Sequence, residues 1–342
     1  MSAFHVLRAV DPDRYDIEAV GITREGTWVR ADDAVAALHA GAAALPAPTT
    51  GLGRLEATGT AVEPLATITP AIGDDAPVVV LPLLHGPHGE DGTVQGMLEL
   101  AGVPFVGSGV LGSALCMDKL KTKDVLAAHD LPQVPWVGVR DIDADDVVTL
   151  VARAGLRYPL FVKPANLGSS VGVSRAVDDA ALVEATALAA TYDEWIVAEE
   201  SAQGRELEVS VLGNADPRAS VPGEIIPGGD FYDYDDKYLN DAAELLIPAE
   251  LPPGVTEELQ RLAREAFTIL RCDGMARVDF FYEQDDRGLL VNEVNTIPGF
   301  TPISQYPKLW EASGLPYDQL IDELVRLALE RHERRSRFST KR

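Results

Sequence analysis

Two adjoining segments carry charged and amide side chains at a spacing suited to phosphate chemistry. Arg277 and Asp279 lie two residues apart in MARVDFFY, and Glu293 and Asn295 lie two residues apart in LLVNEVN. Both segments alternate apolar and polar residues as strands do, so side chains two apart share one face. Paired as a hairpin across residues 283–288, the strands would present two carboxylates, an amide and a guanidinium together. Such oxygen donors suit Mg²⁺, and a cation beside them stabilises negative charge that develops in a reaction.

A solvated sheet face is the alternative interpretation of this hairpin, because polar residues on half-buried strands usually point to water. The residues that follow Asn295 favour a site. The turn TIPGFT, residues 296–301, brings backbone N–H groups close to whatever the carboxylates hold.

A loop rich in glycine and serine is a second candidate for phosphate binding. Lys163 ends an apolar strand and precedes ANLGSSVG, whose backbone N–H groups and hydroxyls could wrap a phosphate while the lysine supplies charge. The alternative is an ordinary hairpin with a lysine whose ammonium reaches water. No G-x-x-x-x-G-K-[S/T] motif occurs in the chain, so this is not a Walker loop.

Two further sets of polar residues lie at predicted strand ends. Glu199 and Glu200 end a strand, where a carboxylate and backbone groups could bind an adenine, although a surface pair is the simpler interpretation. His85 and Glu90 flank a glycine-rich turn after a buried strand, at the edge where open α/β sheets bind ligands. A structural histidine is the alternative there.

A polar, aromatic stretch over residues 228–240, GGDFYDYDDKYLN, reads as a loop rather than a helix or strand. Tyr238, beside Lys237, could belong to a lid that closes over a substrate. An exposed aromatic residue in a loop is the alternative.

The elements around these residues predict a mixed α/β protein. Residues 78–84 and 103–106 read as strands on either side of a helix that Asp91 or Thr93 caps, a βαβ arrangement typical of a parallel sheet. Other strands are expected at 15–22, 136–139, 195–201 and 205–213, and on both sides of the loop within 158–176. Helices are expected at 2–10, 114–129, 143–154, 178–190, 256–271 and 318–331, followed by a frayed basic tail.

Length and composition limit the class of protein. The 342 residues allow two or three domains, and 46% apolar with 24% charged residues is ordinary for a globular protein. A formal net charge of −25, from 54 acidic and 29 basic residues, argues against nucleic acid or an anionic membrane as a partner. An anionic small ligand stays possible where lysine, arginine and a metal ion are concentrated.

Cysteine usage and hydropathy point to the cytoplasm. Cys116 and Cys272 are far apart in apolar segments and read as buried free thiols in a reducing compartment. The N-terminus lacks the apolar core of a signal peptide, and no run approaches the roughly 20 apolar residues of a membrane span.

Six motifs together resemble one family. HGPHGEDGTVQG, GSGVLGSALCMDKLKTK, FVKPANLGSSVG, FYDYDDKYL, ARVDF and NEVNTIPGFT occur in the order and at roughly the spacings of the D-alanine–D-alanine ligases, which have the ATP-grasp fold. The resemblance runs from about residue 1 to 330. It implies three domains: an N-terminal α/β substrate-binding domain (1–107) with a truncated Rossmann-like sheet, a central ATP-grasp lobe (108–203), and a C-terminal catalytic lobe (204–330). The basic tail (331–342) follows.

The resemblance implies roles for the matching residues. Lys119 and Lys163 would hold the ATP phosphates, Glu199 the adenine and Glu206 the ribose. The full ATP-binding set is Lys119, Lys163, Ser169, Glu199, Glu200, Ala202 and Glu206. The ligands of two Mg²⁺ ions, for which Mn²⁺ could substitute, would be Asp279, Glu293 and Asn295. The catalytic set would be Arg277, Ser169, Tyr238 and the Gly299 N–H, and the substrate-binding set His85, Lys237, Ser304 and Gln305.

The implied reaction joins two D-alanines for peptidoglycan precursor synthesis. One D-alanine carboxylate attacks the γ-phosphate of ATP, and the amine of the second attacks the resulting acyl phosphate. Tyr238 favours the dipeptide, because family members that use D-lactate depart from tyrosine there, so a D-lactate or D-serine ligase is the alternative. The partners implied are ATP and D-alanine, and a homodimer stays open.

The start of the chain departs from the family pattern. Family members begin with a strand and an FGGxSxEHxVS-type loop whose glutamate binds the first substrate, and MSAFHVL aligns just after that loop. The missing piece is on the order of 20 residues, about one strand plus its turn. As given, the chain is expected to have weak or absent ligase activity, or to be a nucleotide-binding, catalytically silent homologue, unless the true start lies upstream.

Overall fold

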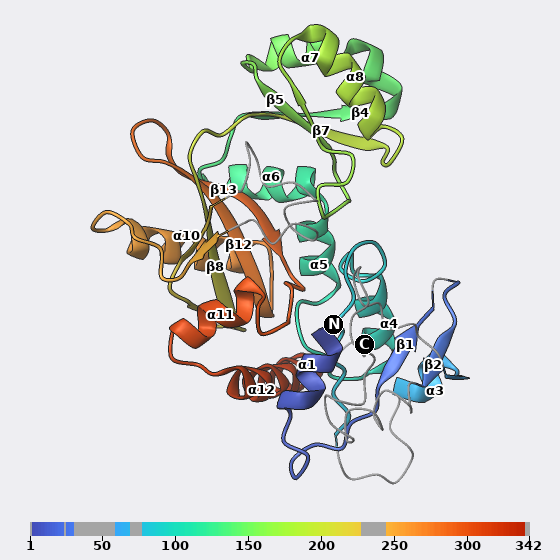
Figure 1. Ribbon diagram of the computed structural model, residues 1–342. Coiled ribbons are helices and arrows are strands. Elements are labelled where there is room, and N and C mark those ends of the chain that lie inside the picture. The colour runs from blue at the N-terminus through green and yellow to red at the C-terminus, as the bar shows by residue number, and fades with distance from the viewer. Residues whose placement is uncertain (1, 24, 31–58, 69–76, 227–243, 339–342) are drawn as a thin grey trace. The chain divides into compact units, whose positions relative to one another are not determined.

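The computed structural model describes residues 2–23, 25–30, 59–68, 77–226 and 244–338. The chain divides into two compact units, coloured by residue number in Figure 1. The first unit combines residues 1–83, 97–106 and 299–342, and the second combines 84–96 and 107–298. The division into three domains stays a prediction.

The first unit has a small core and a short antiparallel sheet in the order β1-β2-β3. Ile68, Leu98 and Phe105 form the core, with Trp28 and Val80 packed against it. Its elements are α1 (Ser2–Ala9), β1 (Val20–Ile22), β2 (Trp28–Arg30), β3 (Thr60–Ala61), α3 (Pro64–Ile68), the end of α4 (Thr93–Ala101), α11 (Gln305–Ala312) and α12 (Tyr317–Ser336).

The predicted strands at 78–84 and 103–106 are reduced to one parallel bridge, between Val80 and Phe105. Their parallel direction agrees with the βαβ prediction, but their length does not. Pro82 and Pro104 lie inside these segments. Because proline has no N–H to donate, it prevents a longer ladder.

The predicted tail is wrong for residues 331–336, which continue helix α12. Arg331 is only 4% exposed, donates to the Glu99 carboxylate at 2.9 Å, and lies 4.6 Å over the Phe105 ring. It continues the buried stripe of Leu324 and Ala328 by one more turn. The basic composition of the segment gives no sign that Arg331 is buried, because its partners lie more than 200 residues away in sequence.

A four-stranded antiparallel sheet in the order β4-β7-β5-β6 lies in the second unit. Helices α7 and α8 cover it, with Val151 and Leu182 packed against Val162 (Figure 1). The elements are β4 (Trp136–Arg140), η2 (Asp141–Asp146), α7 (Val147–Ala154), β5 (Leu160–Pro164), β6 (Ser174–Ala176), α8 (Asp179–Ala189) and β7 (Trp195–Glu200).

The sequence predicted the first residue of α8 more closely than that of α7. The helix predicted over 178–190 begins at Asp179, and Asp178 caps it by accepting the Ala181 N–H at 2.9 Å. The helix predicted from Asp143 instead begins at Val147, after a 3-10 turn over Asp141–Asp146. Aspartates favour caps and turns over helix interiors, and the run DIDADD contains four of them.

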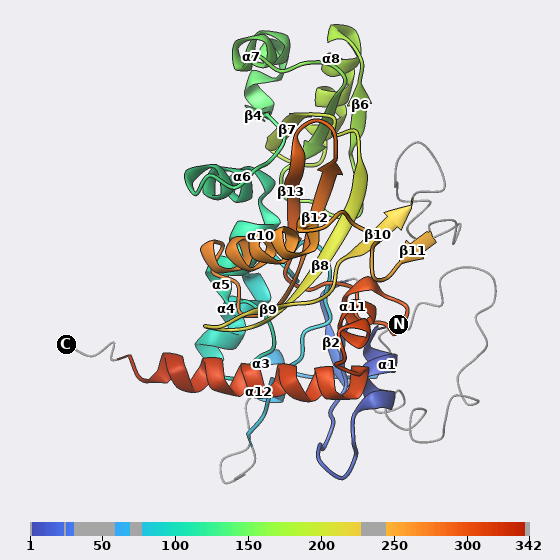
Figure 2. The same cartoon turned by 90° about the vertical axis from the view of Figure 1, so that its left-hand side faces the viewer.

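The second sheet of this unit has the strand order β11-β10-β8-β12-β13, with β9 paired to β8. The predicted core residues Leu207, Val209 and Val211 of β8 are all fully buried. Helix α10 covers this face and contributes Phe267 to the same core (Figure 2). The elements are β8 (Arg205–Gly213), β9 (Arg218–Ala219), β10 (Gly223–Ile226), β11 (Glu244–Leu246), α10 (Val255–Ile269), β12 (Gly274–Glu283) and β13 (Gly288–Asn295).

The helix predicted over residues 114–129 is two helices, α5 (Val110–Met117) and α6 (Lys119–Ala128). Asp118 separates them, because its extended backbone leaves the helix and its carboxylate accepts the Lys121 N–H at 3.0 Å. Lys119 therefore stands at the first position of α6. Among the described residues, no helix is both long and apolar enough to cross a membrane.

Candidate active site

The hairpin predicted to carry the chemistry is formed by β12 and β13. Asp279 pairs with Glu293 and Arg277 pairs with Asn295, so the four side chains share one face as the alternation predicted. On the other side of β12, Asp279 pairs with Glu208 of β8. The face opposite the α10 core is therefore lined with carboxylates around one arginine.

Arg277 is held in the centre of this face. Its Nε and Nη2 atoms each donate to the Asp279 carboxylate at 2.7 Å, and its Nε lies 3.2 Å from the Glu208 carboxylate. Burial by itself would lower the pKa of Arg277, but Asp279 and Glu208 outweigh it and raise the pKa well above its usual value. Asn295 donates its amide N–H to Asp279 at 2.9 Å. The arginine is thus a fixed positive charge.

Lys163 and Glu199 lie together on the four-stranded sheet. The Lys163 ammonium lies 2.5 Å from the Glu199 carboxylate, and the Lys123 ammonium, from α6, lies 2.8 Å from its other oxygen. Glu199 is only 4% exposed and Lys123 only 1%. Burial alone would raise the pKa of Glu199, but the two ammonium groups prevail and lower it to about 2.

The Glu199 carboxylate makes the stability of the fold sensitive to acid. The pKa of Glu199 in the folded chain, about 2, is below its ordinary value of 4.5, so the stabilisation is complete above pH 4.5 and is lost as the pH falls toward 2. We expect the urea midpoint to fall over this range in the wild type and to fall less steeply in Lys123→Met, where the pKa of Glu199 is closer to 4.5. Equal acid slopes in the two proteins would contradict this assignment.

Lys119 connects the charged groups of the second unit. Its ammonium donates to the Leu167 carbonyl, and its backbone N–H donates to the Ala165 carbonyl at 3.0 Å. Burial lowers the pKa of Lys119, while Glu293 acts in the opposite direction. Lys163, Glu199 and Glu90 also act on its charge. The predicted phosphate-binding lysines therefore lie within electrostatic reach of each other and of the hairpin carboxylates.

The glycine and serine loop after Lys163 has an unusual backbone. Ser169 and Ser170 adopt positive φ angles of 54° and 57°, a conformation that costs free energy for residues other than glycine. The Asn166 N–H and amide both donate to the Asp193 carboxylate, at 2.7 and 3.1 Å, and fix the start of the loop. Ser169 is exposed at its tip. Strain at an exposed, anchored loop is typical of a ligand-binding segment.

Glu199 and Glu200 point to opposite faces of β7. The Glu200 carboxylate accepts the Arg157 N–H at 2.9 Å and lies 3.3 Å from an Arg287 nitrogen, away from the lysines. Its side chain is therefore not brought together with the other predicted ATP-binding groups. Ala202 lies in the irregular linker after β7, and Glu206 lies on the same face of β8 as Glu208.

His85 lies in the loop before α4 with its side chain half exposed and its Nδ1 3.8 Å from the Glu90 carboxylate. Glu90 accepts the Gly86 N–H at 2.5 Å, which closes the glycine-rich turn. Asp91 accepts the Thr93 N–H at 2.9 Å at the start of the helix, as predicted. His85 is therefore available to solvent from a turn that Glu90 holds.

The remaining predicted residues fall in the first unit or outside the described residues. The Ser304 hydroxyl accepts the Thr301 N–H at 3.1 Å, and Gly299 lies against the same hydroxyl. Gln305 begins α11, is 9% exposed, and neither polar atom of its side chain has a hydrogen-bond partner among the described residues. The predicted lid residues Lys237 and Tyr238 lie outside the described residues.

Two residues of the site were missed in the sequence. Lys123 follows Lys119 by four positions, so the two lysines share one side of α6, and that spacing could have revealed it. Glu208 lies on the polar face of β8, and the alternation of RELEVSVLG could have indicated it.

The hairpin face suits a magnesium ion that binds together with ATP. No group of three or more His, Cys, Asp or Glu side chains arranged to hold a metal occurs in the described ranges. Asp279, Glu293 and Asn295 supply two carboxylates and an amide, and Mg²⁺ usually takes one or two carboxylates together with phosphate oxygens and waters. The donors suit Mg²⁺ bound with a nucleotide better than a metal held by protein alone.

Comparison with known proteins identifies the family. The model for the D-Ala–D-Ala ligase N-terminus matches residues 1–108, and the model for the C-terminus matches residues 125–326. A D-alanine–D-alanine ligase of Solibacter usitatus is 54% identical over 75% of this chain and 78% of that protein. One from Listeria welshimeri is 45% identical over 97% of this chain and 91% of that protein.

Solved structures agree with the family models. The D-alanine–D-alanine ligase from Coxiella burnetii has a TM-score of 0.79 at 36% identity, over 98% of this chain and 90% of that one. The VanG D-Ala:D-Ser ligase from Enterococcus faecalis has a TM-score of 0.78 at 31% identity, over 96% of this chain and 94% of that one. The mixed α/β class and the ATP-grasp fold predicted from the sequence are confirmed. The chain belongs to the D-alanine–D-alanine ligase family.

Proposed function

We propose that this chain uses ATP to join two D-alanines into D-alanyl-D-alanine, through an acyl phosphate, for peptidoglycan precursor synthesis. The observation that carries the proposal is the face of the β12–β13 hairpin, where Arg277, Asp279, Glu293 and Asn295 are gathered. Membership of the ligase family gives this face its reaction.

The phosphates of ATP are assigned to the lysines and the glycine and serine loop. Lys119 and Lys163 bring two ammonium groups to the α- and β-phosphates, and Ser169 brings a hydroxyl and a backbone N–H. Asp279, Glu293 and Asn295 would hold two Mg²⁺ ions, for which Mn²⁺ could substitute. The metal would neutralise phosphate charge during transfer.

The nucleoside is assigned to the ends of β7 and β8. Glu199 would accept from the adenine amino group, the backbone near Ala202 would bind the ring edge, and Glu206 would hold the ribose. Glu199 needs its negative charge for this role, and Lys123 and Lys163 keep it ionised. The side chain of Glu200, held by Arg157 and Arg287, is left as support for the strand end.

The reaction has two steps. A carboxylate oxygen of the first D-alanine attacks the γ-phosphorus, and the bond to the β-phosphate oxygen breaks to give ADP and an acyl phosphate. The amine of the second D-alanine then attacks the acyl carbon, loses a proton, and expels inorganic phosphate. Arg277 and the Gly299 N–H stabilise the tetrahedral oxyanion of this second step. Shielding by Tyr238 and its loop would limit hydrolysis of the acyl phosphate.

The two amino acids are assigned to the remaining predicted residues. His85 would lie beside the first D-alanine, and Lys237, Ser304 and Gln305 beside the carboxylate of the second. Ser304 precedes the first N–H groups of α11, which suit a carboxylate. We also propose a homodimer and a place in the cytoplasm, where ATP is made, and we retain the three-domain division at 107 and 203.

The function is tested by following ADP and dipeptide together. We expect ADP formation to require D-alanine and a divalent metal, and mass spectrometry to show one D-alanyl-D-alanine per ADP. L-Alanine should give no product, and D-serine or D-lactate should compete poorly as second substrates. ATP turnover that is independent of D-alanine, or a dominant mixed product, would overturn the proposal.

A further inference from the structure

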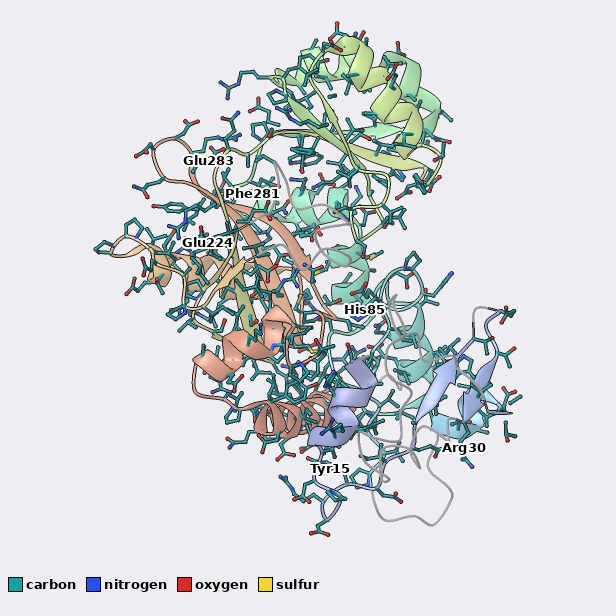
Figure 3. The ribbon with its side chains drawn as sticks, viewed as in Figure 1. Tyr15, Arg30, His85, Glu224, Phe281 and Glu283 are labelled. Atoms are coloured by element: carbon teal, nitrogen blue, oxygen red, sulfur yellow. The ribbon has the colours of Figure 1, made fainter. Side chains whose placement is uncertain are left out.

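An ion-pair cluster lies at the turn of the β12–β13 hairpin, apart from the residues assigned to the reaction. Arg287 donates from Nε and Nη2 to the two oxygens of Glu283, both at 2.6 Å. Its Nη2 also donates to the Ser201 carbonyl at 2.9 Å, and its Nη1 lies 3.3 Å from the Glu200 carboxylate. Figure 3 shows Glu283 beside this turn. One guanidinium thus joins the hairpin to the end of β7.

The same cluster fixes the linker between β7 and β8, residues 201–204. The Gln203 N–H donates to the Glu283 carboxylate at 2.6 Å, and the Ser201 N–H donates to the Pro159 carbonyl at 3.0 Å. At Gly204 a Cβ would lie 2.3 Å from the Tyr282 carbonyl oxygen, so the two backbones are in direct contact. The linker is therefore held against the end of β12 at Gln203 and Gly204, and against Pro159 at Ser201.

These contacts determine the position of the linker, because it belongs to neither sheet. Residues 201–204 have no strand pairing, whereas β7 ends at Glu200 and β8 begins at Arg205. A guanidinium that bridges two carboxylates and a carbonyl defines direction as well as distance, which a lysine ammonium cannot reproduce. Hydrogen bonding by Arg287 is the main cause that lowers the pKa of Glu283 to about 2, so the pair is charged near neutral pH.

We infer that Arg287 and Glu283 are positioning residues for base recognition, which hold the 201–204 linker so that its backbone near Ala202 distinguishes adenine from other bases. This inference rests on the proposed function, in which ATP is the nucleotide. A backbone N–H and carbonyl read a base edge only at hydrogen-bond distance. A linker that shifts by a fraction of an ångström therefore loses discrimination while the phosphate site is unchanged.

The test compares ATP with GTP in Arg287→Gln, Arg287→Lys and Glu283→Gln. We expect KM for ATP to rise about tenfold in Arg287→Gln, the size of one lost hydrogen bond, and the preference for ATP over GTP to fall by a similar factor. At saturating ATP, kcat and KM for D-alanine should stay within about threefold of wild type. Arg287→Lys should recover little of the preference, since it restores charge without the planar fork.

A matched control is Arg157→Gln. Arg157 also pairs with Glu200, but it contacts neither Ser201 nor Gln203, and its side chain is 78% exposed. It should leave the preference for ATP unchanged. A cluster with only a structural role would lower the melting temperature in all variants. It would leave the ratio of kcat/KM for ATP to kcat/KM for GTP unchanged.

The outcomes separate the inference from the function on which it rests. A wild type that forms no ADP with D-alanine overturns the proposed function. A wild type that is active and prefers ATP, with the same preference in Arg287→Gln and Glu283→Gln, overturns the inference alone. If Arg287→Gln does not fold, Glu283→Gln decides, because it keeps the volume of the side chain and weakens the hold on both Arg287 and the Gln203 N–H.

Discussion

Replacing Asp279 with asparagine should lower kcat by about 10²- to 10³-fold, the loss typical of a preorganised charged group at a reacting centre. Asp279 holds Arg277 through two hydrogen bonds and accepts a third from Asn295. The substitution removes the charge that holds the arginine and one of the two carboxylates that we propose as metal ligands. Phosphate release at saturating ATP and D-alanine measures kcat, and electron paramagnetic resonance of added Mn²⁺ measures metal binding.

Asp285→Asn is the control, because Asp285 is exposed in the turn of the same hairpin. It should leave both kcat and Mn²⁺ binding at wild-type values. An Asp279→Asn protein whose kcat is within a factor of three of wild type, with Mn²⁺ bound equally well, would exclude Asp279 from the site.

Replacing Lys123 with methionine should reduce the free energy of unfolding by about 3 kcal/mol, the low end of the cost of removing one partner from a buried ion pair. Lys123 is 1% exposed and pairs with Glu199 at 2.8 Å. Methionine keeps the length of the side chain, so loss of charge rather than of volume is measured. Lys163 remains beside Glu199 and keeps the loss from being larger. Urea unfolding followed by circular dichroism gives the change.

Lys121→Met provides the comparison on the same helix. Lys121 is 61% exposed and pairs with Asp124 at 2.8 Å, the same distance as in the buried pair. Because exposed ion pairs contribute little, this variant should stay within about 0.5 kcal/mol of wild type. Equal losses in the two variants would mean that burial does not set the strength of the Lys123 pair.

The central face of the site could be predicted because it depends on local pattern. Alternation in two strands placed Arg277, Asp279, Glu293 and Asn295 on one face, and the register of the hairpin needed only a short turn between them. The same rule, applied to β7, separates Glu199 from Glu200, which the predicted ATP-binding set had combined. Because a strand offers only one of two neighbouring side chains to each face, the two carboxylates do not face the same ligand, and the ATP-binding role of Glu200 stays a prediction.

The rest of the site depends on contacts between distant segments. Lys123 looks like a solvated helix residue until Glu199, 76 positions later, covers it. The role inferred for Arg287 depends on its hydrogen bond to the Ser201 carbonyl, 86 positions earlier. Arg331 continues an apolar stripe that its charge conceals. Each of these burials follows from tertiary packing, which no window of sequence contains.

The most direct test is a crystal structure of the chain with Mn²⁺ and a non-hydrolysable ATP analogue. The account predicts anomalous scattering peaks at coordination distance from Asp279, Glu293 and Asn295, the analogue's phosphates beside the Lys119 and Lys163 ammonium groups, and its adenine at the linker after β7. A nucleotide bound elsewhere, or metal peaks away from the β12–β13 hairpin, would contradict it.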